Sequence, residues 1–334
     1  MFEEIKKHPR LLMEVELEPV QGDRFQPTGF PDIGAADYTT PDGTRKLLVE
    51  SAQSMANRLE KTILDGEGPM LSKELKGLPY VVSNLVGDKE TVTSSLMEAH
   101  RLNSPFIIAD DELQANFKEK VGYRKGKKGD VLNWIDWKKI GSTFLFYDPN
   151  SIIHGVFMVN LKEGGSRIRL PRALTGFIEA IDIREVSCGG VKNNPLDPKG
   201  EIKAVNIDTD VYSNVPYHRT EYTAKKICAY FNLDIALLKG YSLPEEALDL
   251  LIALSLYKIR RFLNTGLRLR TACDLKVRGE IKVETPKGIV IPPEDKLLGI
   301  MRQKIEECKK FFAEPSVTKV TVETRKTSSK REKK

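Results

Sequence analysis

The segment VESAQSMANRLE (residues 49–60) carries a row of short hydrogen-bonding side chains on one side of a predicted helix. The buried side follows the i, i+3, i+4, i+7 spacing, with Ala52, Met55, Ala56 and Leu59. The opposite side lacks acidic residues and consists of Ser51, Gln53, Ser54, Asn57 and Arg58. A solvated helix face normally mixes Glu with Lys. Hydroxyl, amide and guanidinium groups donate hydrogen bonds to phosphate oxygens, so the row predicts a surface that holds a nucleic-acid backbone.

Further candidates for phosphate contacts lie at the predicted ends of other elements. They are Gln21, Arg24, Arg169, Arg172, Lys192 and Arg219, within a wider basic set of Arg167, Lys225, Arg260, Arg261, Arg268 and Arg270. A surface salt bridge or a partner for a helix C-terminus explains each of these alone equally well. For Ser51, a plain helix N-cap is the alternative.

Two aspartates in the loop after the first strand, Asp23 and Asp32, raise a second class of function, a metal-dependent ribonuclease. Loop aspartates more often form turns, and no second carboxylate cluster at fixed spacing accompanies them. The four histidines show no metal-ligand spacing, and the P-loop, GxGxxG, HExxH and GxSxG motifs are absent. We therefore expect no catalytic residue, metal or cofactor, with the ribonuclease as the alternative.

The pattern along the chain predicts the elements that position these residues. Strands are predicted at 12–20, 152–161, 181–187 and 267–277, and helices at 51–60, from Pro171 onward, and at 247–262 after a capping box of Ser242 and Glu245. Residues 66–150 are predicted to be an insertion, and the Gly/Asn/Pro-rich residues 188–216 a protruding hairpin or loop. This order fits an α+β, ferredoxin-like or RNA-recognition-motif-like core.

Composition limits the function classes. The chain has 334 residues and a net charge of +6, most of which lies in the basic tail from Thr318. The body is therefore nearly neutral, and nucleic acid would be held by local grooves. No apolar run is long enough for a membrane span, and four scattered cysteines are typical of reduced thiols in a cytoplasmic protein. The aromatic signature of the RNA-recognition motif is absent, and Glu14, Glu16 and Glu18 on the first strand would repel phosphate unless neighbouring strands compensate.

Several long blocks between about residues 10 and 277 resemble one family. They include PVQGDRFQPTGFPDIGAADY, LLVESAQSMANRLE, DPNSIIHGVFMV, RLPRALTGFIEA, VPYHRTEYTA, IALSLYKIRRFL and GLRLRTACDL. These blocks resemble the backbone RAMP subunit (Csb family) of the type I-G, formerly I-U, CRISPR-Cas effector complex (Cascade).

The resemblance implies a single palm domain over residues 1–317, a modified RNA-recognition-motif fold of the RAMP superfamily. It implies a finger insertion at about 66–150 and a thumb at about 188–216, while residues 318–334 are expected to be a disordered basic tail. Copies of such a subunit stack head to tail along the spacer of a CRISPR RNA, hold its backbone, and present its bases to target DNA beside the other effector-complex subunits. Such a subunit is not an enzyme. Type III relatives cleave RNA with an aspartate in the loop that holds Asp23, whereas type I complexes do not, so a structural role is expected for Asp23.

Overall fold

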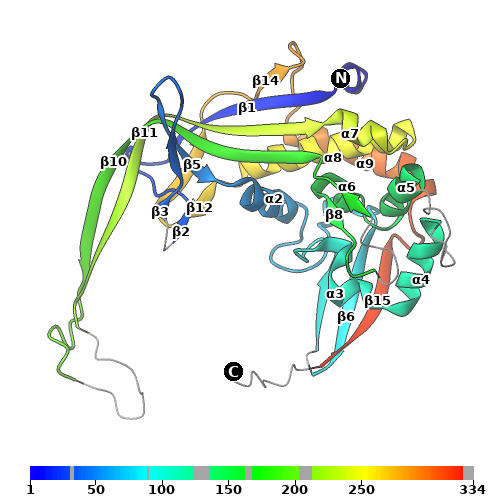
Figure 1. Cartoon of the computed structure of the whole chain (residues 1–334), viewed down its shortest axis with the longest axis horizontal. Helices are drawn as coiled ribbons and strands as arrows, with labels where there is room; N and C mark the ends of the chain where they lie inside the picture. Colours follow the sequence, from blue (N-terminus) through cyan, green and yellow to red (C-terminus); the bar gives the residue numbers. More distant parts are fainter. Residues whose placement is uncertain (31–33, 89, 123–135, 162–167, 203–212, 326–334) are drawn as a thin grey trace, which may run out of the picture.

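The protein is an α/β fold whose main antiparallel sheet curls and extends into a long hairpin (Figure 1). The computed structural model describes residues 1–30, 34–88, 90–122, 136–161, 168–202 and 213–325. The main sheet contains β1 (Arg10–Pro19), β4 (Asp37–Thr39), β5 (Arg45–Glu50), β10 (Leu174–Lys192), β11 (Val215–Asp234), β12 (Arg268–Arg270), β13 (Cys273–Val277) and β14 (Lys282–Thr285). Its order is β12-β13-β1-β11-β10-β5-β4, and β14 also pairs with β1.

Helices cover one face of this sheet, because every second residue of its strands is apolar on that side. The helices of this region are α1 (Phe2–Lys6), α2 (Ala52–Lys61), α7 (Ile235–Gly240), α8 (Glu245–Asn264) and α9 (Glu294–Cys308). Met13 and Gly176 flank Phe231 in register across three strands. Phe231 meets Phe262 of α8, and a Cβ on Gly176 would lie 3.1 Å from Met55 of α2. The apolar residues that recur with the helical and strand periods of the sequence therefore pack into one core. The predicted first strand and the predicted helices at 51–60 and 247–262 are confirmed.

A second lobe lies beside the main sheet (Figure 1). It contains β6 (Tyr80–Gly87), β7 (Thr91–Ser94), β15 (Val317–Thr324), α3 (Pro105–Ile108), α4 (Asp111–Lys120), α5 (Trp137–Tyr147), α6 (Pro149–His154) and the short 3-10 helices η1 (Lys73–Leu75), η2 (Arg101–Asn103) and η4 (Lys309–Phe311). Two small ladders, β2 (Gly29–Phe30) with β3 (Gly34–Ala35) and β8 (Val156–Phe157) with β9 (Arg169–Leu170), complete the described strands.

The disordered tail predicted from residue 318 is wrong in its first part. Val317–Thr324 is β15, which pairs in parallel with all of β6. Val320 and Val322 are buried, and they alternate with exposed Lys319, Thr321 and Glu323, which is the pattern of a strand with one buried face. The predicted domain boundary at 317 is therefore wrong as well. Residues 326–334 lie outside the described part of the chain.

Four further local predictions are corrected. Within the strand predicted at 152–161, only Val156–Phe157 is a strand, β8, and residues 152–154 belong to helix α6. This helix begins after Asp148, whose carboxylate accepts hydrogen bonds from the Asn150 N–H and the Ser151 hydroxyl. Pro171 precedes strand β10 instead of a helix, because residues from Leu174 pair in register with β11. Helix α8 begins after Pro244 and not at a capping box. The predicted strand at 267–277 is two strands, β12 and β13, separated by a tight turn.

The outer parts of β10 and β11 form the hairpin that extends from the sheet at the left of Figure 1. Pairing continues outward to Lys192 and Val215. Beyond it, the Asp197 carboxylate accepts hydrogen bonds from the N–H groups of Gly200, Glu201 and Ile202 at 2.9, 2.8 and 2.7 Å. These bonds fix the described part of the predicted thumb, whereas residues 203–212 lie outside the described residues. The predicted strand at 181–187 is confirmed as part of β10.

A buried polar cluster joins α2, α6 and α8. The side chain of Lys258 is fully buried, and its Nζ lies 2.9 Å from His154 Nε2 and donates to Asn150 Oδ1. Arg101 donates to both oxygens of Glu60 at 2.6 and 2.8 Å and to the Gly155 carbonyl at 2.8 Å. The pairing satisfies groups that would each cost several kcal/mol if buried alone. The cluster therefore fixes the second lobe against the helix that carries the predicted phosphate-binding row.

We expect this cluster to make the protein more stable at alkaline pH. Burial lowers the pKa of Lys258 from 10.5 to about 7, although Glu60 and Asp148 oppose the shift. At pH values between the two pKa values, about 7 and 10.5, Lys258 is protonated in the unfolded chain and deprotonated in the folded chain. The free energy of unfolding therefore rises with pH in this range. Lys258 should contribute a gain of about 2 kcal/mol from pH 7 to about pH 9, measured by urea denaturation as the difference in pH dependence between the parent protein and Lys258→Met, because the buried thiols of Cys228, Cys273 and Cys308, whose pKa values are raised, act in the opposite direction in both proteins. The Lys258→Met variant should lose the gain, whereas Lys225→Met, at an exposed lysine of β11, should keep it; an unchanged gain in Lys258→Met would contradict the assignment.

Candidate nucleic-acid interface

A cleft of about 560 Å³ lies where the loop after β1 meets β11 and the turn between β12 and β13. It is lined by Val20, Gln21, Gly22, Asp23, Arg24, Arg219, Glu221, Gly266, Ala272 and Asp274. The loop is held in place by backbone hydrogen bonds, because Phe25 exchanges two 2.9 Å bonds with Tyr222 and the Gln26 N–H donates to the Ala272 carbonyl at 2.7 Å. The fold thus brings together three predicted phosphate-binding residues, Gln21, Arg24 and Arg219.

Glu221 organises the two arginines of the cleft. Its carboxylate is almost fully buried and lies 2.5 Å from Arg219 Nη2 and 3.6 Å from Arg24 Nη1. The Cys188 thiol donates to the same carboxylate at 3.2 Å and accepts a 2.9 Å hydrogen bond from Arg24. Arg24 remains 59% exposed, so its guanidinium keeps donors that face solvent.

The charge in the cleft is balanced. Asp23 and Asp274 line it together with Glu221, and Arg268 lies 3.7 Å from Asp274. Anion binding here would depend on the direction of individual donors, because the summed charge gives no attraction. No group of three potential metal-ligating side chains exists among the residues that the structure describes. Asp32, the other aspartate considered for a metal site, lies outside them.

The acid-free row on α2 divides into two parts. Ser51 is the N-cap of α2, and its hydroxyl accepts a 3.2 Å hydrogen bond from the Ser54 N–H. Arg58 donates to Glu50 and to the Leu269 carbonyl, both at 2.6 Å. Gln53 and Asn57 are exposed and lie one helical turn apart. The structure therefore commits Ser51 and Arg58 to the protein itself and leaves the two amides available at the surface.

The sequence prediction missed Glu50, the fully buried carboxylate next to this row. Glu50 accepts hydrogen bonds from Arg58 at 2.6 Å, from Arg270 at 2.5 Å and from the Ser54 hydroxyl. Arg270 also donates to the Gln26 carbonyl at 3.3 Å. This chain of bonds fixes α2 relative to β12 and to the segment that follows the cleft loop. No pattern in the sequence marks Glu50 as buried, since the two-residue alternation of Leu47 and Val49 would place it on the opposite face of the strand.

The remaining predicted residues are distributed more widely. Arg172 donates to the Ala52 carbonyl at 3.0 Å beside the start of α2, and burial lowers its pKa. Arg169 lies on β9, with its guanidinium 5.9 Å from the ring centroid of Phe157. Lys192 lies four residues beyond Cys188 on β10, which is about 13 Å further out along the strand. Arg167 lies outside the described residues. Arg169 and Lys192 are therefore not part of the cleft.

On the face of the sheet opposite the helices, basic side chains compensate the negative charge of the glutamates of β1. Glu16 lies 3.4 Å from Arg278, and Glu18 lies 3.2 Å from Lys276. The neighbouring strand thus neutralises two of the three glutamates that would repel phosphate.

The sequence was compared with protein families and with known structures. The model of the family "CRISPR-associated protein GSU0053 (Cas_GSU0053)" matches residues 11–185, which is more than half of the chain. The chain belongs to the Cas_GSU0053 family. The matched region contains β1, the cleft loop, α2 and most of β10, so it includes Arg24 and the row on α2, whereas Arg219 lies beyond it. A search of curated proteins found no match.

Three solved structures share 11% sequence identity with this Cas_GSU0053 family member. A "CRISPR RNA-guided surveillance complex, pre-nicking" chain aligns over 80% of this chain and 74% of its own, with a TM-score of 0.40. Csc2 of Thermofilum pendens aligns over 92% and 80%, with a TM-score of 0.30. A second "CRISPR RNA-guided surveillance complex" chain aligns over 77% and 72%, with a TM-score of 0.29. TM-scores this low do not establish a shared fold.

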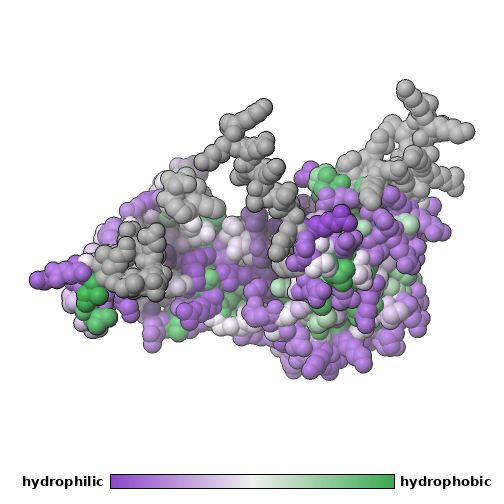
Figure 2. All heavy atoms as spheres, turned by 90° about the horizontal axis from the view of Figure 1, so that it is seen from below, coloured by the Kyte–Doolittle hydropathy of each residue, from purple (hydrophilic) through white to green (hydrophobic). Residues whose placement is uncertain are grey.

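In this member of the Cas_GSU0053 family, α2 lies between the hairpin and the second lobe (Figure 1). Seen from below, the described surface between these two projections is largely hydrophilic (Figure 2). Across the described residues, no helix combines the length and apolar character that crossing a bilayer requires.

Proposed function

We propose that this chain is the CRISPR RNA-binding backbone subunit of a type I-G effector complex, and that it is not itself an enzyme. The observation that carries the proposal is the convergence of predicted phosphate-binding residues in a member of a CRISPR-associated family. Gln21 and Arg24 of the loop after β1 line one cleft with Arg219, which comes from the distant strand β11. The hydrogen bonds of Glu50 to Arg58 and Arg270, and that of Arg270 to the Gln26 carbonyl, fix α2, which carries the exposed amides, relative to the segment after the cleft loop.

The guide is held by its phosphates and sugars. Arg24 supplies charge-assisted hydrogen bonds, and Gln21, Gln53 and Asn57 supply neutral ones, because all four side chains are exposed. None of these contacts requires a particular base, so a guide of any spacer sequence fits and its bases remain available for pairing with target DNA.

The hairpin of β10 and β11 is the thumb in this proposal, and the second lobe contains the finger. The described outer part of the hairpin exposes several apolar side chains, namely Val191, Leu196, Ile202, Val215 and Tyr217. Exposed apolar groups in one projection mark a contact surface. Its partner is the next copy of the chain, so that copies assemble head to tail along the guide beside the other subunits of the complex.

Co-expression with a CRISPR array and the other effector subunits tests the proposal. The purified complex should contain RNA of spacer length, with several copies of this chain per RNA. An assembled complex that contains no RNA would refute the proposal. The alternative ribonuclease is tested on the same complex with complementary RNA and Mg²⁺ or Mn²⁺, where cleavage that is abolished by Asp23→Ala would replace our assignment.

A further inference from the structure

The second lobe carries a surface of lysines and aromatic rings that the proposed guide contacts do not use. Two hollows, of about 620 and 500 Å³, share Lys120 and Phe146. The first lies between α4, the end of α5 and the start of β15, and the second lies along α5 toward Pro244 and Phe311. Because they share two residues, they form one continuous surface across the lobe.

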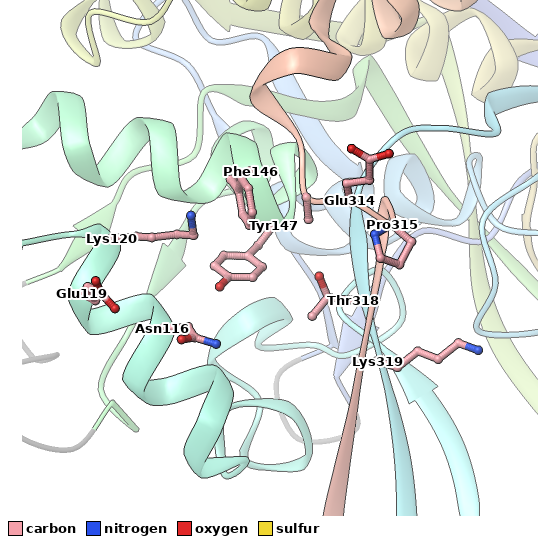
Figure 3. A pocket seen from close by; sticks show the side chains of 10 residues that line it. Asn116, Glu119, Lys120, Phe146, Tyr147, Glu314, Pro315, Thr318 and Lys319 are labelled. Carbon is pink, nitrogen blue, oxygen red and sulfur yellow. The ribbon is translucent and has the colours of Figure 1, made fainter.

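The centre of this surface is a cation next to an aromatic ring. Lys120 Nζ lies 3.7 Å from the ring centroid of Phe146, and Tyr147 meets the same ring edge to face at 4.9 Å and 84°. In Figure 3, Lys120 extends from the end of α4 toward Phe146, while Tyr147 lies between Lys120 and Thr318. Phe146 is half-buried and Tyr147 is buried, so part of the Phe146 ring reaches solvent. Lys120 covers one face of that ring, and a base that stacks there would displace the ammonium toward its own phosphate.

Lysines extend the surface in both directions from this centre. Lys138 and Lys139 line the second hollow, and Lys319 lies at the rim of the first. Within the described parts of the chain, these three lysines and Lys120 form no ion pair with a carboxylate. Among the described carboxylates these lysines have no partner, in contrast to the arginines of the guide cleft, which bind Glu221.

The lysine–aromatic surface has fewer acidic residues than lysines, and one of the acidic residues already accepts a hydrogen bond within the protein. Asp136 is the N-cap of α5, and its carboxylate accepts a 3.1 Å hydrogen bond from the Lys139 N–H. Glu119 and Glu314 line the first hollow. Four lysines against three carboxylates leave a small positive excess, and that excess surrounds the aromatic ring. This arrangement fits a ligand that alternates anionic groups with flat rings.

We propose that this lysine–aromatic surface binds single-stranded nucleic acid, with a base stacked on Phe146 and phosphates on Lys120 and its neighbours. An extended strand suits the surface better than a small ligand, because the two hollows adjoin at Lys120 and Phe146 and are lined by residues from several elements. The site is separate from the guide cleft, since its residues come from α4, α5, η4 and β15 at the edge of the molecule opposite the hairpin (Figure 1). The proposal stands whether or not the cleft binds a guide.

The test uses the full chain and fluorescent oligo-dT and oligo-U, read by anisotropy. The background is the quadruple variant Gln21→Ala/Arg24→Ala/Gln53→Ala/Asn57→Ala, which removes the four proposed guide contacts. This protein should still bind both oligonucleotides. Adding Lys120→Glu and Phe146→Leu should weaken binding about tenfold or more, because stacking of one base alone contributes about 1–3 kcal/mol. Lys120→Arg should bind like the background protein.

A matched control distinguishes the site from general charge. Lys296→Glu, at an exposed lysine of α9 outside both hollows, makes the same charge change as Lys120→Glu and should leave the affinity unchanged. Equal losses in the two variants, or no binding by the background protein, would overturn the proposal. Poly-glutamate binding that shows the same sensitivity to Phe146→Leu would also overturn it, because it would identify a surface for an acidic protein segment.

Discussion

Replacing Glu50 by alanine is expected to lower the free energy of unfolding by about 3–5 kcal/mol. The carboxylate is fully buried and accepts hydrogen bonds from Arg58, Arg270 and Ser54. Its removal leaves two guanidinium groups, each only about a quarter exposed, close to each other without the anion that compensates them. Breaking such a pair is costly because the remaining charge stays partly desolvated.

The matched control for Glu50 is Glu67→Ala. Glu67 is 92% exposed and lies 3.4 Å from the exposed Lys61, and a surface pair of this kind contributes at most about 1 kcal/mol. Urea denaturation of the two variants beside the parent protein gives the comparison, and Glu50→Gln should fall between them because it keeps the shape and part of the hydrogen bonding. Equal urea midpoints for Glu50→Ala and Glu67→Ala would show that the hydrogen bonds of Glu50 to Arg58, Arg270 and Ser54 contribute little to stability.

The Glu50 contact also changes how the row on α2 should be tested. From the sequence alone, reversing the charge of Arg58 is the natural way to weaken phosphate binding. In the structure this change would place a second carboxylate beside Glu50, so a loss of binding would follow from a loss of folding. Gln53 and Asn57 avoid this problem, because both are exposed.

Local periodicity predicted the elements that pack through their own repeating pattern. The alternation of residues 12–20 and the apolar run of 247–262 require no knowledge of a partner, and both were predicted correctly. The C-terminal strand was missed because the basic composition of its neighbours outweighed the alternation of Val320 and Val322, and its pairing partner, β6, lies more than 200 residues earlier. Helix α6 was missed because a short apolar run fits a buried strand equally well.

For the candidate site, too, the sequence identified local features but not the contacts between distant segments. Residue type identified Gln21, Arg24 and Arg219 as phosphate-binding candidates, but only the pairing of Phe25 with Tyr222 brings the loop to β11. The role of Glu50 depends on Arg270, which is 220 residues away in the sequence. Side chains that satisfy a buried charge across such distances cannot be recognised from spacing, and Arg58 was therefore assigned to the surface when it is committed to the core.

The triple variant Arg24→Ala/Gln53→Ala/Asn57→Ala is expected to weaken guide RNA binding about a hundredfold without unfolding the protein. A charge-assisted bond from Arg24 to phosphate contributes about 1.5–3 kcal/mol and each amide about 1 kcal/mol, with incomplete additivity. The three side chains are exposed, so their truncation removes little packing.

The sequence dependence of the loss decides whether these residues contact the backbone. Filter binding with guides of unrelated spacer sequence should show the same factor for each guide, since phosphate contacts carry no base information. The slope of log affinity against log salt should fall by about 0.7, the value for one phosphate contact on a single strand. The control is Lys296→Ala/Arg302→Ala on the outside of α9, where both residues are exposed. A loss of affinity for some spacer sequences only would mean that these side chains read bases. A similar loss in the control variant would mean that general positive charge, and not these three side chains, holds the guide.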